Sequence, residues 1–172
     1  MIERYSRKEL KDIWSEENKY KIWLEVEIAA AEAMEKFKMI PKGVSSIVKK
    51  KGKIKVKRIH DIEAKVKHDV IAFLTSITEQ AGIKARYLHQ GMTSSDVLDT
   101  SFNIQLMQSG KIILKDIDKI LIVLKRQAKK YKMTPCIGRS HGIHAEPITF
   151  GLKLASFSVS YTHLTLPTSD LV

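Results

Sequence analysis

Two histidines beside a glutamate make residues 138–147 the segment of this sequence with the clearest chemical potential. His141 and His144 lie three residues apart, Glu146 follows them, and two glycines flank the first histidine. A metal site is the weaker interpretation, because the glycines and a proline disfavour one continuous helix and the order H-E-x-x-H is missing. We expect an acid/base histidine in a glycine-flanked turn that a substrate can approach. A histidine satisfied by backbone groups is the alternative.

A second polar cluster, Lys67-His68-Asp69, stands at the junction of two expected helices. A cation, an imidazole and a carboxylate are forced together there, and such a triad can orient a histidine. The simpler alternative is that Asp69 caps the following helix while Lys67 and His68 are exposed.

The third segment, residues 91–96, is a turn that feeds into a long helix, with Thr93 and Asp96 in capping-box spacing. The free amides of a helix start, its positive dipole end and the neighbouring hydroxyls also suit a carboxylate or phosphate. Every helix needs a cap, so capping by itself explains the pattern without a ligand.

In the segments that must position these residues, apolar side chains recur almost throughout at the spacing of an α-helix, which predicts an all-α fold. The expected short helices cover residues 6–14, 15–37, 41–51, 56–67 and 70–80. Ser15 should cap the second of them, and Pro41 should open the third. In the second helix the expected buried stripe is Ile22, Val26, Ala29, Ala30 and Met34. We assign residues 1–92 to one N-terminal helical domain.

Residues 93–133 predict one long helix, which would begin a central helical-bundle domain at 93–158. No proline interrupts it, and apolar residues recur at three-four spacing in Leu106, Ile113, Ile117, Ile120 and Leu124. At roughly 1.5 Å per residue such a helix is about 57 Å long, nearly twice the diameter of a small domain. It should therefore pack in a bundle with helices that this chain does not contain, through subunit association, missing sequence or both.

Composition places the chain among globular proteins. Its 172 residues are 44% hydrophobic and 28% charged, which excludes extended disorder. No apolar run approaches the roughly 18 residues of a membrane span, no secretory signal begins the chain and its single cysteine has no partner, so a cytoplasmic location is expected. The net charge of +11 suggests nucleic-acid binding, but most of the basic residues are lysines rather than the arginines that favour phosphate and base recognition. The six lysines between residues 49 and 57 are more simply explained as a solvated surface.

The last 14 residues, 159–172, differ from the rest of the chain. They contain no lysine or arginine, whereas the preceding 158 residues hold all 30. The string also looks like the translation of a sequencing adapter read in frame, so we expect a non-native tail outside the fold. A natural polar tail after a helix is the alternative.

Taken together, several segments resemble the adenylosuccinate lyase family of the fumarase and aspartase superfamily in order and spacing. These segments are residues 1–6, 13–19, 23–27, 67–70, 93–96 and 138–147. The resemblance covers about residues 1–158, in roughly the first third of such an enzyme, and implies a truncated N-terminal fragment. Ser140 stands where threonine is more usual in the family, a substitution that keeps the hydroxyl.

The resemblance implies an all-α homotetramer whose central domains share one helical bundle. It also implies a carbon–nitrogen lyase that eliminates fumarate from adenylosuccinate, giving AMP, and from the succinyl-carboxamide ribotide of purine biosynthesis. The substrate is a small nucleotide, and neither a metal nor an organic cofactor is expected. In this reaction a base removes a proton from the carbon next to a carboxylate, and an acid protonates the departing nitrogen.

Carried over residue by residue, the resemblance makes His141 the general acid and His68 a second catalytic histidine, which supports substrate charge. The implied substrate-binding positions are Arg4, Tyr5, Lys67, His68, Asp69, Thr93 and Ser94. The family's base is a serine in a Ser-Ser-x-Met-Pro-x-Lys-x-Asn-Pro loop, which this chain lacks. Each active site also draws on three subunits, so the chain alone should be inactive.

Two other functions compete with this prediction. Sister lyases such as argininosuccinate lyase and the carboxymuconate cycloisomerases share the capped long helix and the histidine turn in outline. The cations of Arg4 and Lys67 favour a nucleotide phosphate over an amino-acid substrate. A basic helical RNA-binding module ranks third, because it would rest on lysine content alone.

Overall fold

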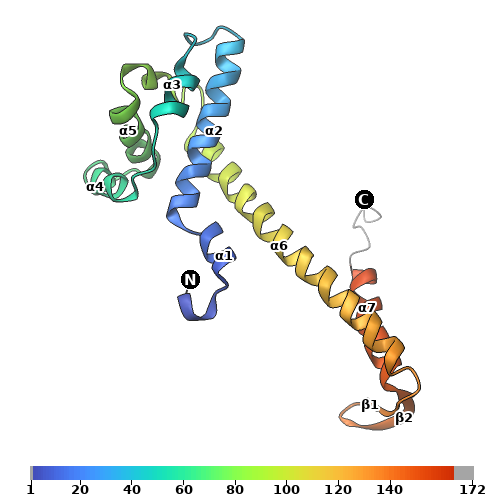
Figure 1. Cartoon of the computed structure of the whole chain (residues 1–172). Helices are drawn as coiled ribbons and strands as arrows, with labels where there is room; N and C mark the ends of the chain where they lie inside the picture. The colour runs from blue at the N-terminus through green and yellow to red at the C-terminus, as the bar shows by residue number, and fades with distance from the viewer. Residues whose placement is uncertain (1, 165–172) are drawn as a thin grey trace. The chain divides into compact units, whose positions relative to one another are not determined.

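The computed structural model describes residues 2–164, without the side chains of Glu3 and residues 161–164. Within these residues the chain forms seven α-helices, two 3₁₀ helices and one two-stranded hairpin (Figure 1). The predominance of helix confirms the predicted all-α class, to which the hairpin is a local exception. None of the helices in the described part is both long and apolar enough to cross a membrane.

The chain divides into two compact units, Met1–Gly110 and Lys111–Val172. The first unit contains η1 (Glu3–Tyr5), α1 (Lys8–Ile13), α2 (Glu16–Lys36), α3 (Val44–Lys51), α4 (Val56–Val66), α5 (Asp69–Ala81), η2 (Ile83–Tyr87) and the first part of α6 (Ser94–Lys130). The second contains the rest of α6, β1 (Pro135–Ser140), β2 (Ile143–Thr149) and α7 (Phe150–Leu164). The domain boundary predicted after residue 92 lies just before α6 and stays a prediction. Helix α7 extends through residue 164 of the expected tail, and residues 165–172 lie outside the described residues.

Local signals set the ends of the first helices. The Ser15 hydroxyl accepts the amide proton of Asn18 at 3.2 Å, which confirms Ser15 as the cap of α2. Pro41 was expected to open the next helix, and this was wrong, since α3 begins at Val44 after Gly43, whose φ of 90° only glycine adopts freely. The Glu35 carboxylate accepts the Ser45 amide proton there at 2.6 Å, and this bond lowers the pKa of Glu35.

The core of the first unit is built around three aromatic rings from α2 and α5. Tyr20 and Phe73 stack with centroids 5.9 Å apart, and Trp23 meets them edge-on at 5.2 and 5.5 Å. The buried face of α2 is therefore Tyr20, Trp23, Leu24, Glu27 and Ala31, with Ile22 also buried. The predicted stripe was wrong in part, because Ala29 is exposed and Val26 only half-buried. Large aromatic rings remove more apolar area from water, so they take the core face.

The first part of α6 docks on the corner between α1 and α2. The carbonyl oxygen of Ile13 accepts amide protons from both the Asn18 and the Gln105 side chains, each at 2.8 Å. Beside this bond the rings of Trp14 and Phe102 lie 5.9 Å apart. A predicted long helix is confirmed here, and its start is anchored within the first unit.

The second unit has almost no interior of its own. Among its residues 111–160, only Gly151 is buried. A Cβ at Gly151 would lie 2.5 Å from the Ala128 carbonyl oxygen, so glycine lets α7 approach α6 closely. Large apolar side chains of the unit are exposed at Ile113, Leu114, Ile120, Ile122, Leu152 and Phe157. Of the predicted apolar stripe of the long helix, Ile113 and Ile120 are thus exposed in the described part of this unit, whereas Ile117 and Leu124 are half-buried.

Candidate functional site

His141 lies at the tip of the β1–β2 hairpin. Ser140 pairs with Ile143, which leaves His141 and Gly142 as a two-residue turn. Their φ angles are 53° and 77°, and positive values at both central residues are those of a type I′ hairpin turn. Histidine tolerates this conformation and glycine adopts it without strain. The predicted glycine-flanked turn is confirmed, and it presents the exposed imidazole to solvent.

A bulge below this tip depends on a second glycine. Ile137 pairs with Pro147 and Arg139 with His144, so two residues of β2 face Gly138 alone. A Cβ at Gly138 would lie 2.7 Å from the Glu146 carbonyl oxygen, which no side chain could tolerate without a shift. The bulge increases local twist and helps to aim the tip. Among the described residues, no three histidine, cysteine, aspartate or glutamate side chains gather as metal ligands would.

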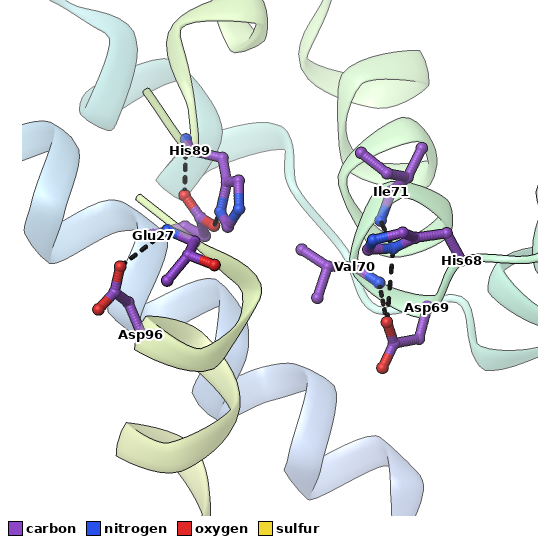
Figure 2. A network of polar contacts seen from close by, with 8 residues as sticks. Glu27, His68, Asp69, Val70, Ile71, His89 and Asp96 are labelled. Carbon is purple, nitrogen blue, oxygen red and sulfur yellow. Dashed lines mark hydrogen bonds and ion pairs between the residues drawn. The ribbon is translucent and has the colours of Figure 1, made fainter. Parts of the chain in front are cut away.

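His68, rather than Asp69, caps α5 (Figure 2). Lys67 ends α4 with a φ of 56°, which turns the chain sharply before the next helix. The Nδ1 atom of His68 then accepts the Ile71 amide proton at 3.4 Å. Asp69 is the first helical residue, and its carboxylate accepts the Val70 amide proton at 2.7 Å. The prediction that Asp69 is the cap was therefore wrong by one residue.

The protonation of His68 decides between two contacts. Its Nδ1 atom also lies 3.5 Å from Oδ1 of Asp69. One ring nitrogen cannot accept from Ile71 and donate to Asp69 at the same time, so a neutral ring capped on Ile71 carries its proton on Nε2. The side chains of His68 and Asp69 are 48% and 42% exposed. The imidazole is thus oriented by the helix start and still open to a ligand.

The start of α6 has the predicted cap. The Thr93 amide donates to Oδ2 of Asp96 at 2.8 Å, which is one half of a capping box (Figure 2). Ser94 is the first helical residue and is half-buried, whereas Thr93 is exposed. Capping is confirmed, and the anion site that the same geometry would allow stays a prediction.

Arg4 and Tyr5 form a small exposed platform in η1. The guanidinium carbon of Arg4 lies 4.6 Å from the centroid of the Tyr5 ring, and the Tyr5 side chain is 72% exposed. A guanidinium over an aromatic face keeps its hydrogen-bond donors free for phosphate oxygens. The first unit therefore carries every predicted binding residue, and the second carries His141.

The structure also contains a polar pair that the sequence reasoning missed. Glu27 is fully buried, and its carboxylate accepts the His89 backbone amide proton at 2.9 Å and lies 2.6 Å from His89 Nδ1. A signal was present, because Glu27 follows Leu24 by three residues and precedes Ala31 by four, all on the core face of α2. A carboxylate at such a position needs a partner. Figure 2 shows the pair near the start of α6.

Comparison with known proteins gives close relatives. The family model described as lyase matches residues 3–165. The chain is 49% identical over 154 residues to adenylosuccinate lyase of Thermotoga maritima, 48% over 157 residues to that of Synechocystis sp. and 44% over 155 residues to that of Bacillus subtilis. These alignments cover 90–91% of this chain and 36% of each relative, so the chain spans little more than a third of their length.

Solved structures share the fold. A fumarate lyase from Mesorhizobium sp. BNC1 matches with a TM-score of 0.83 and 25% identity, over 90% of this chain and 37% of that protein. The 3-carboxy-cis,cis-muconate lactonizing enzyme from Pseudomonas putida also has a TM-score of 0.83 and 25% identity, over 92% of this chain and 38% of that enzyme. The described helices and hairpin therefore follow an arrangement known from larger, mostly helical enzymes.

Proposed function

Since this chain belongs to the lyase family, we propose that it is the N-terminal part of an adenylosuccinate lyase. The complete enzyme would eliminate fumarate from adenylosuccinate, giving AMP, and from the succinyl-carboxamide ribotide of purine biosynthesis. One observation carries this proposal. Identity of 44–49% to three adenylosuccinate lyases extends over at least 154 residues. Identity to the sister enzymes of known structure is 25%, which disfavours their substrates.

His141 would act as the general acid. In the elimination a base takes the proton from the carbon beside a carboxylate, the carbon–nitrogen bond breaks with its electron pair leaving on nitrogen, and the acid supplies a proton there. An exposed imidazole on a narrow hairpin tip can reach into a site completed by other parts of the enzyme. The rigid I′ turn limits the positions that this acid can take.

The other predicted residues would bind the nucleotide and its succinyl group. Arg4 and Tyr5 suit the phosphate because their stacked side chains are exposed. His68 and Asp69 would orient the substrate from the start of α5. Thr93 and Ser94 would hold a carboxylate with hydroxyls, amides and the positive end of the α6 dipole.

The base, the remaining subunits and the cellular location are also part of the proposal. The chain has no Ser-Ser-x-Met-Pro-x-Lys-x-Asn-Pro loop, so on its own it should release no fumarate. Exposed apolar side chains on α6 and α7 are those expected of a helix bundle shared between subunits, which supports a homotetramer. We expect such a metabolic enzyme to work in the cytoplasm.

Fumarate release by the complete protein tests this function. We expect turnover of adenylosuccinate, and the His141→Ala variant should lower kcat by about a hundredfold or more, because a positioned acid contributes on the order of 10² to 10⁴ in rate. The RNA-binding alternative would instead be favoured if the complete protein released no fumarate and bound single-stranded RNA with an affinity that rises steeply as the salt concentration falls.

His144 supplies the matched control for this test. It lies three residues from His141 on the same hairpin, pairs with Arg139 in the strand ladder and has no assigned proton. The His144→Asn variant should lose about tenfold or less in kcat, through local packing. Equal losses for both variants, with activity restored by zinc after chelation, would contradict a cofactor-free general acid.

A further inference from the structure

We propose that Glu27 is a positioning residue that acts through His89 to set the turn leading into α6, and with it Thr93 and Ser94. This inference rests on the proposed function for the role of Thr93 and Ser94, which would hold the succinyl carboxylate. Glu27 itself belongs to α2 and lies 62 residues from His89 in sequence. It need not touch substrate to act in this way.

The burial of Glu27 makes its contact with His89 energetically necessary. The carboxylate is 0% exposed, whereas the side chain of His89 keeps 17% of its surface in contact with solvent. A buried carboxylate without hydrogen-bond donors is costly, so both of its oxygens need partners. Oε2 accepts the backbone amide proton of His89 at 2.9 Å and Oε1 lies 2.6 Å from ring Nδ1. One residue thus satisfies both oxygens.

The backbone of His89 explains what the contact achieves. Its φ of 62° is left-handed, a conformation that a non-glycine residue adopts at some cost. The chain turns again at Gly91, with a φ of 69°, and the Met92 amide donates to the His89 carbonyl oxygen at 3.4 Å. Holding His89 from both its backbone and its ring therefore fixes the first residue of a tight turn. That turn ends at the capped start of α6.

The ring of His89 reports on the contact directly. Glu27 is a pure acceptor when ionised, so Nδ1 must carry the proton that lies between them. Nε2 has no hydrogen-bond partner among the described residues. A glutamine at position 27 could instead donate its amide proton to Nδ1, and the neutral ring would then carry its proton on Nε2. The tautomer of His89 therefore reports whether its ring is still held by an ionised carboxylate at position 27, and the exchange measurements in the control variant distinguish this from a general loss of packing.

The same helix offers a matched control. Glu35 lies eight residues after Glu27 on α2, and its carboxylate accepts the Ser45 backbone amide proton at the start of α3. Glu27→Gln and Glu35→Gln therefore remove the same charge from the same helix, and each weakens the hold on one helix start. Only the start of α6, which Glu27 holds through His89, carries predicted substrate-binding residues. The start of α3, which Glu35 holds, carries none.

The experiment uses the full 172-residue chain for structure and the complete protein for kinetics. In ¹⁵N-histidine spectra of the chain, His89 should carry its proton on Nδ1, and Glu27→Gln should move it to Nε2. Amide exchange at residues 89–96 should become about tenfold faster in Glu27→Gln. In Glu35→Gln the acceleration should appear around Ser45 and not at residues 89–96. In the complete protein, Glu27→Gln should raise KM for adenylosuccinate about tenfold, and Glu35→Gln should change it less than about twofold.

An unchanged His89 tautomer, or exchange at residues 89–96 that is unaffected, would overturn the proposal. Acceleration at residues 89–96 of the same size in both variants would also overturn it, because that result indicates general loosening of α2. If Glu27→Gln fails to fold, His89→Ala keeps the carboxylate bonded to the backbone amide and removes the ring. It should still accelerate exchange at residues 93–96, and unchanged exchange there would count against the proposal. A wild-type protein that releases no fumarate would refute the proposed function and leave the tautomer and exchange results to decide the role of Glu27.

Discussion

The first unit buries its large apolar side chains against one another, whereas the second presents most of its own to solvent. Helices α2, α3, α4 and α5 enclose Tyr20, Phe73 and a set of fully buried aliphatic residues. In the second unit Gly151 lets α7 approach α6 closely, and side chains such as Ile120 and Phe157 stay more than half exposed. The two units come from one continuous sequence with similar apolar content along its helices.

The difference shows that apolar periodicity predicts a helix face and does not say what covers it. In the first unit five short helices supply partners for one another within about a hundred residues. In the second unit the hairpin and α7 cover little of the long helix, so its stripe needs partners from outside the described residues. The first unit should therefore be stable by itself, and the second should be stabilised by partners from outside the described residues.

The largest expected effect contrasts two phenylalanines. Phe73 is fully buried against Tyr20 and Trp23, so Phe73→Ala should lower the free energy of unfolding by about 3–5 kcal/mol. Phe157 is 53% exposed, and Phe157→Ala should cost less than about 1 kcal/mol in the chain alone. Urea unfolding followed by circular dichroism measures both. Equal losses at low protein concentration would mean that the second unit has a core of its own.

The next effect depends on burial that only the first unit provides. Burial, followed by the nearby carboxylates of Glu16, Glu63 and Asp69, raises the pKa of Tyr20 to about 12 from 10.0. The folded state therefore holds this proton more tightly, so its stabilising contribution is complete below pH 10 and is lost as the pH rises toward 12. The loss amounts to about 3 kcal/mol, since each pKa unit corresponds to about 1.4 kcal/mol. Thermal unfolding from pH 9 to 12 should decline less steeply in Tyr20→Phe than in the wild type, and parallel curves would contradict the assignment.

A glycine substitution tests the close approach of α7 to α6 in the second unit. A Cβ at Gly151 would lie 2.5 Å from the Ala128 carbonyl oxygen and 2.6 Å from the Lys132 Cα. We expect Gly151→Ala to force α7 away from α6 and to cost about 1–3 kcal/mol. Hydrogen exchange should accelerate in α7 and in residues 128–134, while α2 and α5 keep their protection. Loss of protection in α5 would show that the two units unfold together.

The smallest effect concerns Gly110, which lies inside α6 where the two units divide. Apart from its chain neighbours and the nearby backbone of its own helix, no described atom lies within 4 Å of a Cβ built there, so alanine should fit without strain. Gly110→Ala should stabilise the helix by about 0.5–1 kcal/mol, because alanine loses less conformational freedom on folding. Exchange of amides on both sides of residue 110 should slow. A destabilised variant would mean that the chain needs the freedom of glycine at this boundary.

The sequence by itself determined the features that depend on near neighbours. Ser15 caps α2 through Asn18, and Thr93, just before α6, donates its amide proton to Asp96, both within one helical turn. The tight turn at His141 follows from the adjacent Gly142 and is equally local. The apolar stripe of α6 was also predictable, since it reflects spacing along one helix. Even the incomplete cover of that stripe could be predicted by comparing its length with the short helices available.

Only the tertiary structure decided which residues meet across the chain. It placed Tyr20 and Trp23 on the core face of α2 because Phe73, about fifty residues later, offers them a partner ring. It also paired Glu27 with His89, which no local pattern specifies, since the need for a partner is visible at Glu27 and its identity depends on packing. The cap of α5 is His68 rather than the predicted Asp69, because the left-handed turn at Lys67 sets where the helix can begin. These choices depend on which residues meet over long distances in the chain, and sequence spacing does not identify those partners.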